Sequence, residues 1–142
     1  MPTIEKIMTR DPLCCRPDDK VVDCAKLMEH EDVGFVPIVE SLDTRKLLGV
    51  VTDRDLCMQV IAQGRDPNEC TLEELMTDEL VSIGPQEELQ RALDLMAQNQ
   101  IRRLPVVDEH GACIGILSQG DVAKVASPHQ LKATVTAISA TP

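Results

Sequence analysis

Two stretches of the chain decide its fold: residues 3–40, TIEKIMTRDPLCCRPDDKVVDCAKLMEHEDVGFVPIVE, and residues 71–108, TLEELMTDELVSIGPQEELQRALDLMAQNQIRRLPVVD. They align without a gap. The identical residues are Thr3, Glu5, Met8, Thr9, Pro17, Leu27, Met28, Pro37 and Val39, which meet Thr71, Glu73, Met76, Thr77, Pro85, Leu95, Met96, Pro105 and Val107. Further on, Gly49, Thr52 and Asp55 correspond to Gly115, Ser118 and Asp121. Two copies of one unit therefore fill almost the whole chain, which is the sequence signature of a repeat architecture.

Each copy is predicted to contain the same elements in the order βαββα. A short helical turn opens it at 3–8 or 71–76, and a brief strand follows at 13–15 or 80–83. An amphipathic helix comes after the proline that the copies share, since apolar residues recur there at helical spacing. Two short apolar runs then predict two strands, and a second helix is expected to start near Asp55 or Asp121.

The predicted boundaries place repeat one at 3–65, a linker at 66–70, repeat two at 71–127 and a tail at 128–142. The segment GRDPNEC, residues 64–70, carries the Gly, Pro and Asn typical of a connection. In the tail, Ser127, Pro128 and Gln130 have the spacing of a helix start, so a last short helix is expected. Neither repeat is expected to be stable alone, because three strands and two helices leave an apolar face uncovered.

Composition excludes several classes of function. A chain of 142 residues with 43% hydrophobic residues can bury its own core, and Phe35 is its only aromatic residue. The net charge of −10 argues against binding to nucleic acid or to an anionic membrane surface, since both need a basic surface. No apolar run approaches the length of a membrane span, and we expect a soluble cytoplasmic protein.

The cysteines are predicted to be reduced and partly buried thiols. Six of them lie in apolar patterns, and no Cys or His cluster has the spacing of a zinc site, so no metal is expected. A disulfide framework is typical of smaller secreted chains. Vicinal Cys14 and Cys15 leave open a redox-responsive protein, although bridging neighbours strains the intervening peptide.

The motifs of the two copies resemble those of a CBS-domain pair, also called a Bateman module. They are MTRDPLCCRPDDKVVDCAKLM, GFVPIV and GVVTDRDL in copy one, and MTDELVSIGPQEELQRALDLM, RRLPVVD and GILSQGDV in copy two. The linker GRDPNEC and the short tail further resemble those of small stand-alone bacterial members, including hypoxic-response-type proteins. This resemblance implies an α+β (α/β-like) fold: two βαββα repeats related by a pseudo-two-fold axis, with small sheets flanked by helices. It also implies homodimers and clefts in which some members bind AMP, ADP, ATP, S-adenosylmethionine or NAD-type nucleotides, with no cofactor required.

The motif G-h-h-[ST]-x-x-D of this family supplies Thr52 and Asp55 in one copy and Ser118 and Asp121 in the other. A carboxylate can accept two hydrogen bonds from a ribose diol, and a hydroxyl with nearby N–H groups can face a phosphate. The same spacing is also typical of a helix N-cap with an acidic residue in the first turn, which needs no ligand. Both interpretations stay open at this point.

The two predicted clefts differ in their basic residues. Arg102 and Arg103 precede Leu104 in copy two, while Gly34 and Phe35 stand at the equivalent places in copy one. From the family arrangement, one cleft is expected to combine Thr52, Asp55, Arg102, Arg103, Ser82 and Ile83, and the other Ser118, Asp121, Phe35 and the Cys14 region. Arg54 and Lys124 are further candidates, and a solvated arginine pair is the alternative to a phosphate clamp.

Catalysis has little support in the sequence. Ser118 lacks the preceding glycine of a nucleophile elbow, and neither a P-loop nor a zinc-protease motif is present. We expect a non-catalytic regulatory module that binds an adenosine-type nucleotide, forms a homodimer and acts on an unidentified protein partner. The alternatives are a structural or protein-interaction module with empty clefts, and a thiol-based redox-responsive protein.

Overall fold

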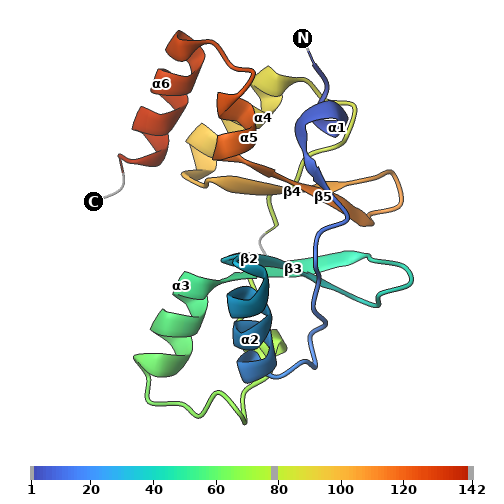
Figure 1. Ribbon diagram of the computed structural model, residues 1–142, viewed down its shortest axis with the longest axis vertical. Helices are drawn as coiled ribbons and strands as arrows, with labels where there is room; N and C mark the ends of the chain where they lie inside the picture. Colours follow the sequence, from blue (N-terminus) through green and yellow to red (C-terminus); the bar gives the residue numbers. More distant parts are fainter. Residues whose placement is uncertain (1, 78–79, 141–142) are drawn as a thin grey trace. The chain divides into compact units, whose positions relative to one another are not determined.

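The chain folds into two compact units, which Figure 1 shows in a computed structural model that describes residues 2–77 and 80–140. Unit 1 comprises Met1–Asp11 and Val81–Pro142, and unit 2 comprises Pro12–Leu80. These bounds differ from the predicted repeat boundaries at 3–65 and 71–127, because the opening segment of each repeat packs on the other repeat.

The two repeats thus exchange their opening segments. In unit 1, backbone hydrogen bonds hold the opening segment of repeat one against repeat two. Helix α1 (Ile4–Ile7) begins where the Ile4 N–H donates to the Glu87 carbonyl at 3.1 Å and the Glu5 N–H to that of Pro85 at 2.9 Å. Strand β1 (Thr9–Arg10) then pairs antiparallel with β5 (Cys113–Ser118), which lies between β1 and β4 (Arg103–Val107).

Unit 2 receives the corresponding segment of repeat two. The Leu72 N–H donates to the Asp19 carbonyl at 3.0 Å and the Glu73 N–H to that of Pro17 at 2.9 Å. A 3₁₀ turn, η2 (Leu72–Glu74), follows, and Thr77 then bridges to Val50. Strands β2 (Phe35–Val39) and β3 (Leu47–Thr52) form the antiparallel hairpin beside it.

Gly49 and Gly115 make the exchange possible. A Cβ at Gly49 would stand 2.8 Å from the Thr77 carbonyl oxygen, and one at Gly115 would stand 2.9 Å from that of Thr9. The incoming segment thus lies against the glycine of the receiving strand in both units. This close approach is a physical reason why the two glycines correspond in the repeat.

The helices follow the predicted amphipathic patterns. Helix α2 (Val21–Glu31) covers the unit 2 hairpin, and α4 (Leu89–Asn99) and α6 (Pro128–Ile138) belong to unit 1. Both α2 and α4 end at a residue in the left-handed region, Asp32 and Gln100, with φ of 54° and 53°. In the tail, α6 begins with the capping pair of Ser127 and Gln130.

One prediction differs in detail from the structure. The strands expected at 13–15 and 80–83 are reduced to one parallel bridge each, Cys15 to Ile38 and Ile83 to Val106. The second helices start near Asp55 and Asp121, as expected: they are α3 (Asp53–Leu56), which continues as the π-helix η1 (Cys57–Ile61), and α5 (Gln119–Ala123).

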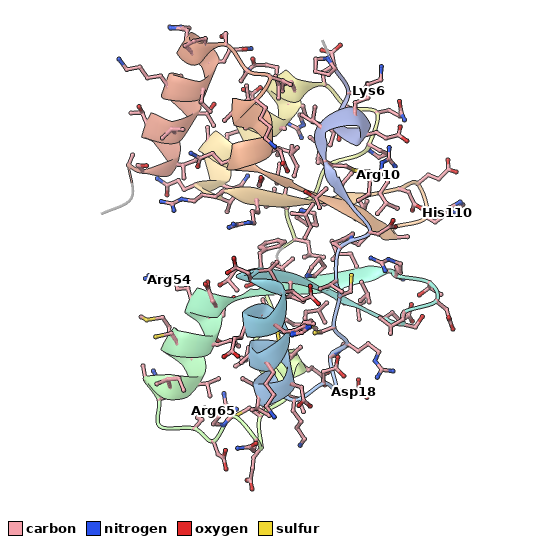
Figure 2. All side chains as sticks on the ribbon, in the orientation of Figure 1. Lys6, Arg10, Asp18, Arg54, Arg65 and His110 are labelled. Carbon is pink, nitrogen blue, oxygen red and sulfur yellow. The ribbon has the colours of Figure 1, made fainter. Side chains whose placement is uncertain are left out.

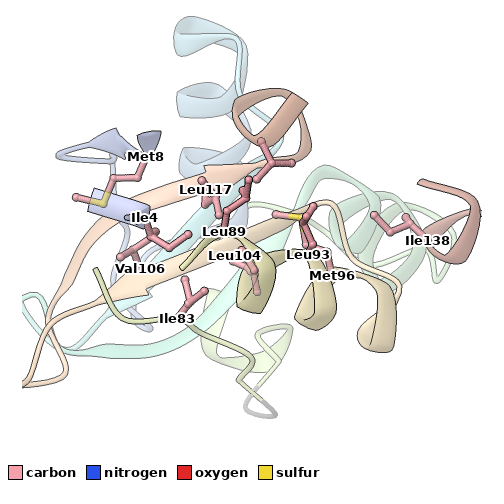
Figure 3. Close-up of a cluster of buried hydrophobic side chains, with 12 residues drawn as sticks. Ile4, Met8, Ile83, Leu89, Leu93, Met96, Leu104, Val106, Leu117 and Ile138 are labelled. Carbon is pink, nitrogen blue, oxygen red and sulfur yellow. The ribbon is translucent and has the colours of Figure 1, made fainter. Parts of the chain in front are cut away.

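Each unit has its own aliphatic core. Figure 3 shows the core of unit 1, in which β4, β5, α1, α4 and α6 all contribute fully or nearly buried side chains. Its labelled members are Ile4, Met8, Ile83, Leu89, Leu93, Met96, Leu104, Val106, Leu117 and Ile138. Unit 2 has a separate core that includes three cysteines, Cys15, Cys24 and Cys70. The α+β class predicted from the repeat is confirmed.

Candidate functional site

The turn between β5 and α5 holds Ser118 and Asp121 in a reciprocal capping box. The Ser118 N–H donates to Asp121 Oδ2 at 2.9 Å, and the Asp121 N–H donates to Ser118 Oγ at 3.0 Å. The other carboxylate oxygen, Oδ1, has no hydrogen-bond partner within the described part of unit 1. Because an ionised carboxylate accepts at both oxygens, Oδ1 can serve a ligand while Oδ2 holds the helix start.

Unit 2 repeats this turn with Thr52 and Asp55. The Thr52 N–H donates to Asp55 Oδ2 at 2.8 Å, and the Asp55 N–H donates to Thr52 Oγ1 at 3.2 Å. Here Gln59 also donates to Asp55 Oδ1, at 3.4 Å. The capping role that the sequence left open is therefore present in both copies, and it does not use all acceptor capacity in either.

A pocket of about 420 Å³ lies beside the Ser118 turn, entirely within unit 1. Its lining combines two cations, three polar or small residues of the turn and two apolar side chains: Arg102, Arg103, Ser118, Gln119, Gly120, Ala123 and Leu131. Arg103 is the cross-strand partner of Ser118, and the Gln119 N–H donates to the Arg102 carbonyl at 2.8 Å. Sheet register thus holds the arginine pair at the start of α5.

The two arginines lack anionic partners in their own unit. Within residues 2–11 and 81–140, no carboxylate lies at ion-pair distance from Arg102 or Arg103, whereas Arg91 is 3.7 Å from Glu87 and Arg10 is 3.6 Å from Glu5. Two exposed cations side by side repel each other, so an anion in the pocket would be favoured. This is notable in a chain of net charge −10.

The equivalent place in unit 2 has the opposite charge. Phe35 is the cross-strand partner of Thr52, and the Asp53 N–H donates to the Gly34 carbonyl at 2.9 Å, as Gln119 does to Arg102. A Cβ at Gly34 would stand 2.6 Å from Asp53 Oδ2, so this carboxylate occupies the space in front of the glycine. Unit 2 therefore has an anion where unit 1 has two arginines, and Arg54 lies in the first turn of α3 (Figure 2).

The remaining predicted site residues are distributed between the units. Ser82 and Ile83 belong to unit 1, but Ile83 is 1% exposed and its side chain lies in the core, so it is not available to a ligand there. Phe35 is half-buried at the first position of β2, and Lys124 is exposed at the end of α5.

Four pocket residues were not predicted from the sequence: Gln119, Gly120, Ala123 and Leu131. The first two lie inside the S-x-x-D motif, and that position could have indicated them. Leu131 belongs to the tail, where its spacing from Val135 and Ile138 indicates a shared apolar helix face but not a pocket.

The environment of Cys15, a buried thiol of unit 2, favours its protonated form. A hydrogen bond with Cys24 and burial both raise the pKa of the Cys15 thiol far above its ordinary range. Since the thiolate is the reactive species, Cys15 is expected to be unreactive.

No group of three or more His, Cys, Asp or Glu side chains suited to a metal ion occurs among the residues that the structure describes. None of the described helices is both long enough and apolar enough to span a bilayer.

Comparison with known proteins finds the same two repeats and the same fold elsewhere. The family model of the CBS domain matches residues 4–61 and 72–127. The CBS domain-containing protein YhcV of Bacillus subtilis is 40% identical over 123 residues, covering 87% of this chain and 84% of that protein. Hypoxic response protein 1 of Mycobacterium tuberculosis is 33% identical over 138 residues, covering 97% and 94%. The crystal structure of CBSX2 in complex with AMP superposes with a TM-score of 0.75 at 29% identity, covering 93% of this chain and 99% of that one.

Proposed function

Because the chain belongs to the CBS-domain family, with both repeats matched, we propose that it is a non-catalytic regulatory module that binds an adenosine nucleotide in the pocket of unit 1. The observation that carries the proposal is the couple Arg102 and Arg103, which lines that pocket and has no carboxylate at ion-pair distance in the described part of unit 1. The solved relative with bound AMP supports the choice of ligand class.

The proposed roles follow from the chemistry of each group. Arg102 and Arg103 bind the phosphate, since a guanidinium offers several N–H donors in a planar fork. Asp121 Oδ1 accepts from the ribose diol, while Oδ2 stays in the capping box. Thr52 and Asp55 form a second candidate ribose position in unit 2, where Asp53 disfavours a phosphate. ADP, ATP, S-adenosylmethionine and NAD-type nucleotides are further candidates for either position.

Calorimetric titration with AMP and with adenosine tests the phosphate role. We expect AMP to bind more tightly than adenosine, and Arg103→Gln to weaken AMP about tenfold or more, because hydrogen bonds to charged groups contribute ~1.5–3 kcal/mol. Adenosine binding should be unchanged. Arg91→Gln is the matched control, since it removes an exposed arginine of unit 1 that does not line the pocket. Equal affinities of the wild type and Arg103→Gln for AMP would remove the phosphate assignment.

The ribose role of Asp121 is tested by a thermodynamic cycle in which the ligand hydroxyl and the Asp121 side chain are changed separately and together. Removing the 2′-hydroxyl, as in 2′-deoxy-AMP, should weaken binding to the wild-type chain and have no further effect in Asp121→Asn. Asparagine keeps an oxygen for the Ser118 N–H, so the helix start is preserved. An undiminished 2′-hydroxyl effect in the variant would exclude Asp121 as the ribose acceptor.

A structural or protein-interaction role is the second candidate. The capping boxes at both motifs favour it, because Thr52, Asp55, Ser118 and Asp121 have a stabilising role without any ligand. A thermal-shift panel of AMP, ADP, ATP, S-adenosylmethionine and NADH separates the two candidates, since a ligand that binds the folded state raises its melting temperature. No shift at millimolar ligand would favour the structural role.

A homodimer in the cytoplasm is part of the proposal. On η1, Val60 is buried in the unit 2 core, while Met58 and Ile61 are 49% and 65% exposed. These two apolar side chains, one turn apart on the same helix, offer a contact for a second copy of the chain through a closed two-fold interface. A protein partner that reads the nucleotide-bound dimer completes the regulatory role.

A further inference from the structure

Helix α6 contributes to the pocket although it lies outside the two segments that match the CBS-domain family, the second of which ends at residue 127. Leu131, in its first turn, lines the same pocket as Arg102, Arg103 and Ser118. The lining of the pocket therefore combines residues of the β5–α5 turn with a residue of the tail helix.

Several contacts hold α6 in this place. Ser127 Oγ accepts from the Gln130 N–H at 3.2 Å, and Gln130 Oε1 accepts from the Ser127 N–H at 3.0 Å, so the helix start is fixed. The Gln130 side-chain amide also donates to Gln90 Oε1 on α4, at 3.0 Å. At the other end, Gln100 donates to the Ala137 carbonyl at 3.4 Å, and Ile138 is 6% exposed in the unit 1 core (Figure 3).

The pocket needs Leu131 because its other apolar surface is small. Ala123 is the remaining apolar side chain of the lining, and unit 1 contains no aromatic residue, since Phe35 lies in unit 2. Unit 1 itself therefore offers no ring on which a planar base could stack. Of the two aliphatic side chains that line the pocket, Leu131 is the larger.

We propose that Leu131 is an affinity-determining residue of the unit 1 pocket, and that ligand binding and the packing of α6 are coupled. This inference rests on the proposed nucleotide function. The coupling follows from linkage: a ligand that contacts Leu131 binds better when α6 is in place, so it stabilises the packed helix to the same extent. Helix α6 is suited to respond, because its two threonines and one β-branched valine give it a low intrinsic helix propensity.

The test measures AMP affinity in Leu131→Ala and Val135→Ala. Both substitutions shorten an apolar side chain of α6, but Val135 does not line the pocket. Leu131→Ala should weaken AMP about fivefold or more, as expected from the loss of part of a leucine's apolar contact. Val135→Ala should stay within about twofold of wild type. Leu131→Met, which keeps the apolar volume, should bind AMP as wild type does and excludes a folding defect as the cause.

Hydrogen exchange gives an independent readout of the coupling. Saturating AMP should slow exchange of the amides of α6 in the wild type and in Val135→Ala, and should do so less in Leu131→Ala. AMP binding that depends on Arg103 but is equal in Leu131→Ala and wild type would overturn this inference and leave the proposed function intact. Equal losses in Leu131→Ala and Val135→Ala would overturn it too. Absence of AMP binding to the unchanged chain would overturn both.

Discussion

Cys15 and Cys57 show how different two thiols of one unit can be. Cys15 is buried, and its hydrogen bond with Cys24 together with burial raises its pKa, whereas Cys57 is exposed at the start of η1. The thiolate fraction and access to the sulfur both control alkylation. At the residue scale, then, environment rather than the mere number of cysteines decides whether this chain can respond to oxidants.

Native alkylation should therefore proceed in a set order. With iodoacetamide at neutral pH, mass spectrometry of peptides should find Cys57 modified well before Cys15, because Cys15 has neither thiolate character nor access. Urea should remove the difference. The thiols should also be largely reduced in rapidly alkylated cell lysate. A stoichiometric Cys15–Cys24 disulfide there would instead support the redox-responsive alternative.

At the scale of elements, the η2 turn depends on one exposed carboxylate. Glu74 Oε2 accepts from the Thr71 N–H at 2.7 Å, and Glu74 Oε1 lies 2.7 Å from Arg65 Nη2. The backbone hydrogen bond from Thr71, then the charge of Arg65, lowers the pKa of Glu74. A lowered pKa means that the folded state favours the carboxylate, so this carboxylate stabilises the fold.

Glu74→Gln should therefore lower stability in a pH-dependent way. The contribution of Glu74 is present above the unfolded value of about 4.3 and is lost as pH falls through the lower folded pKa. Urea midpoints of variant and wild type should differ at pH 7 and converge near pH 3. Glu73→Gln, which removes an exposed neighbour without a side-chain hydrogen bond to residues 12–77, is the control. The same midpoint difference at both pH values, or in the control, would contradict the role of Glu74.

The elements also show what the sequence could and could not predict. The repeat aligned Gly49 with Gly115 and Ser118 with Thr52, and the hairpins and capping turns follow from those residues. The exchange of opening segments does not follow, because TIEKIMT and TLEELMT are so alike that the sequence does not indicate which hairpin each one packs on. The pocket wall at Leu131 was missed for a related reason: helical spacing shows which residues share a face, but not which of them borders a pocket.

At the scale of the whole molecule, the exposed pair Met58 and Ile61 favours self-association. Light scattering at micromolar concentration should give twice the 15.6 kDa of one chain. Ile61→Lys should shift the mass toward one chain, because a lysine desolvated in an apolar contact is costly. Lys26→Gln, on α2, is a control that changes a charge without touching η1. A single-chain mass for the wild type would exclude the dimer.

On a ribosome, the two units become available at different times. Unit 2 is continuous in sequence and can fold once residue 80 has emerged. Strand β1 instead pairs with β5, which is synthesised roughly 100 residues later. At usual elongation rates, the delay between the synthesis of β1 and that of β5 is about 5–20 s. During that interval the nascent residues 3–10 are already exposed when β3 forms, before residues 71–77 are made. When β3 forms, the segment available to pair with it is therefore residues 3–10, and not residues 71–77, which pair with it in the folded protein. Slower translation between residues 52 and 77 should lengthen the time in which residues 3–10 can compete for β3.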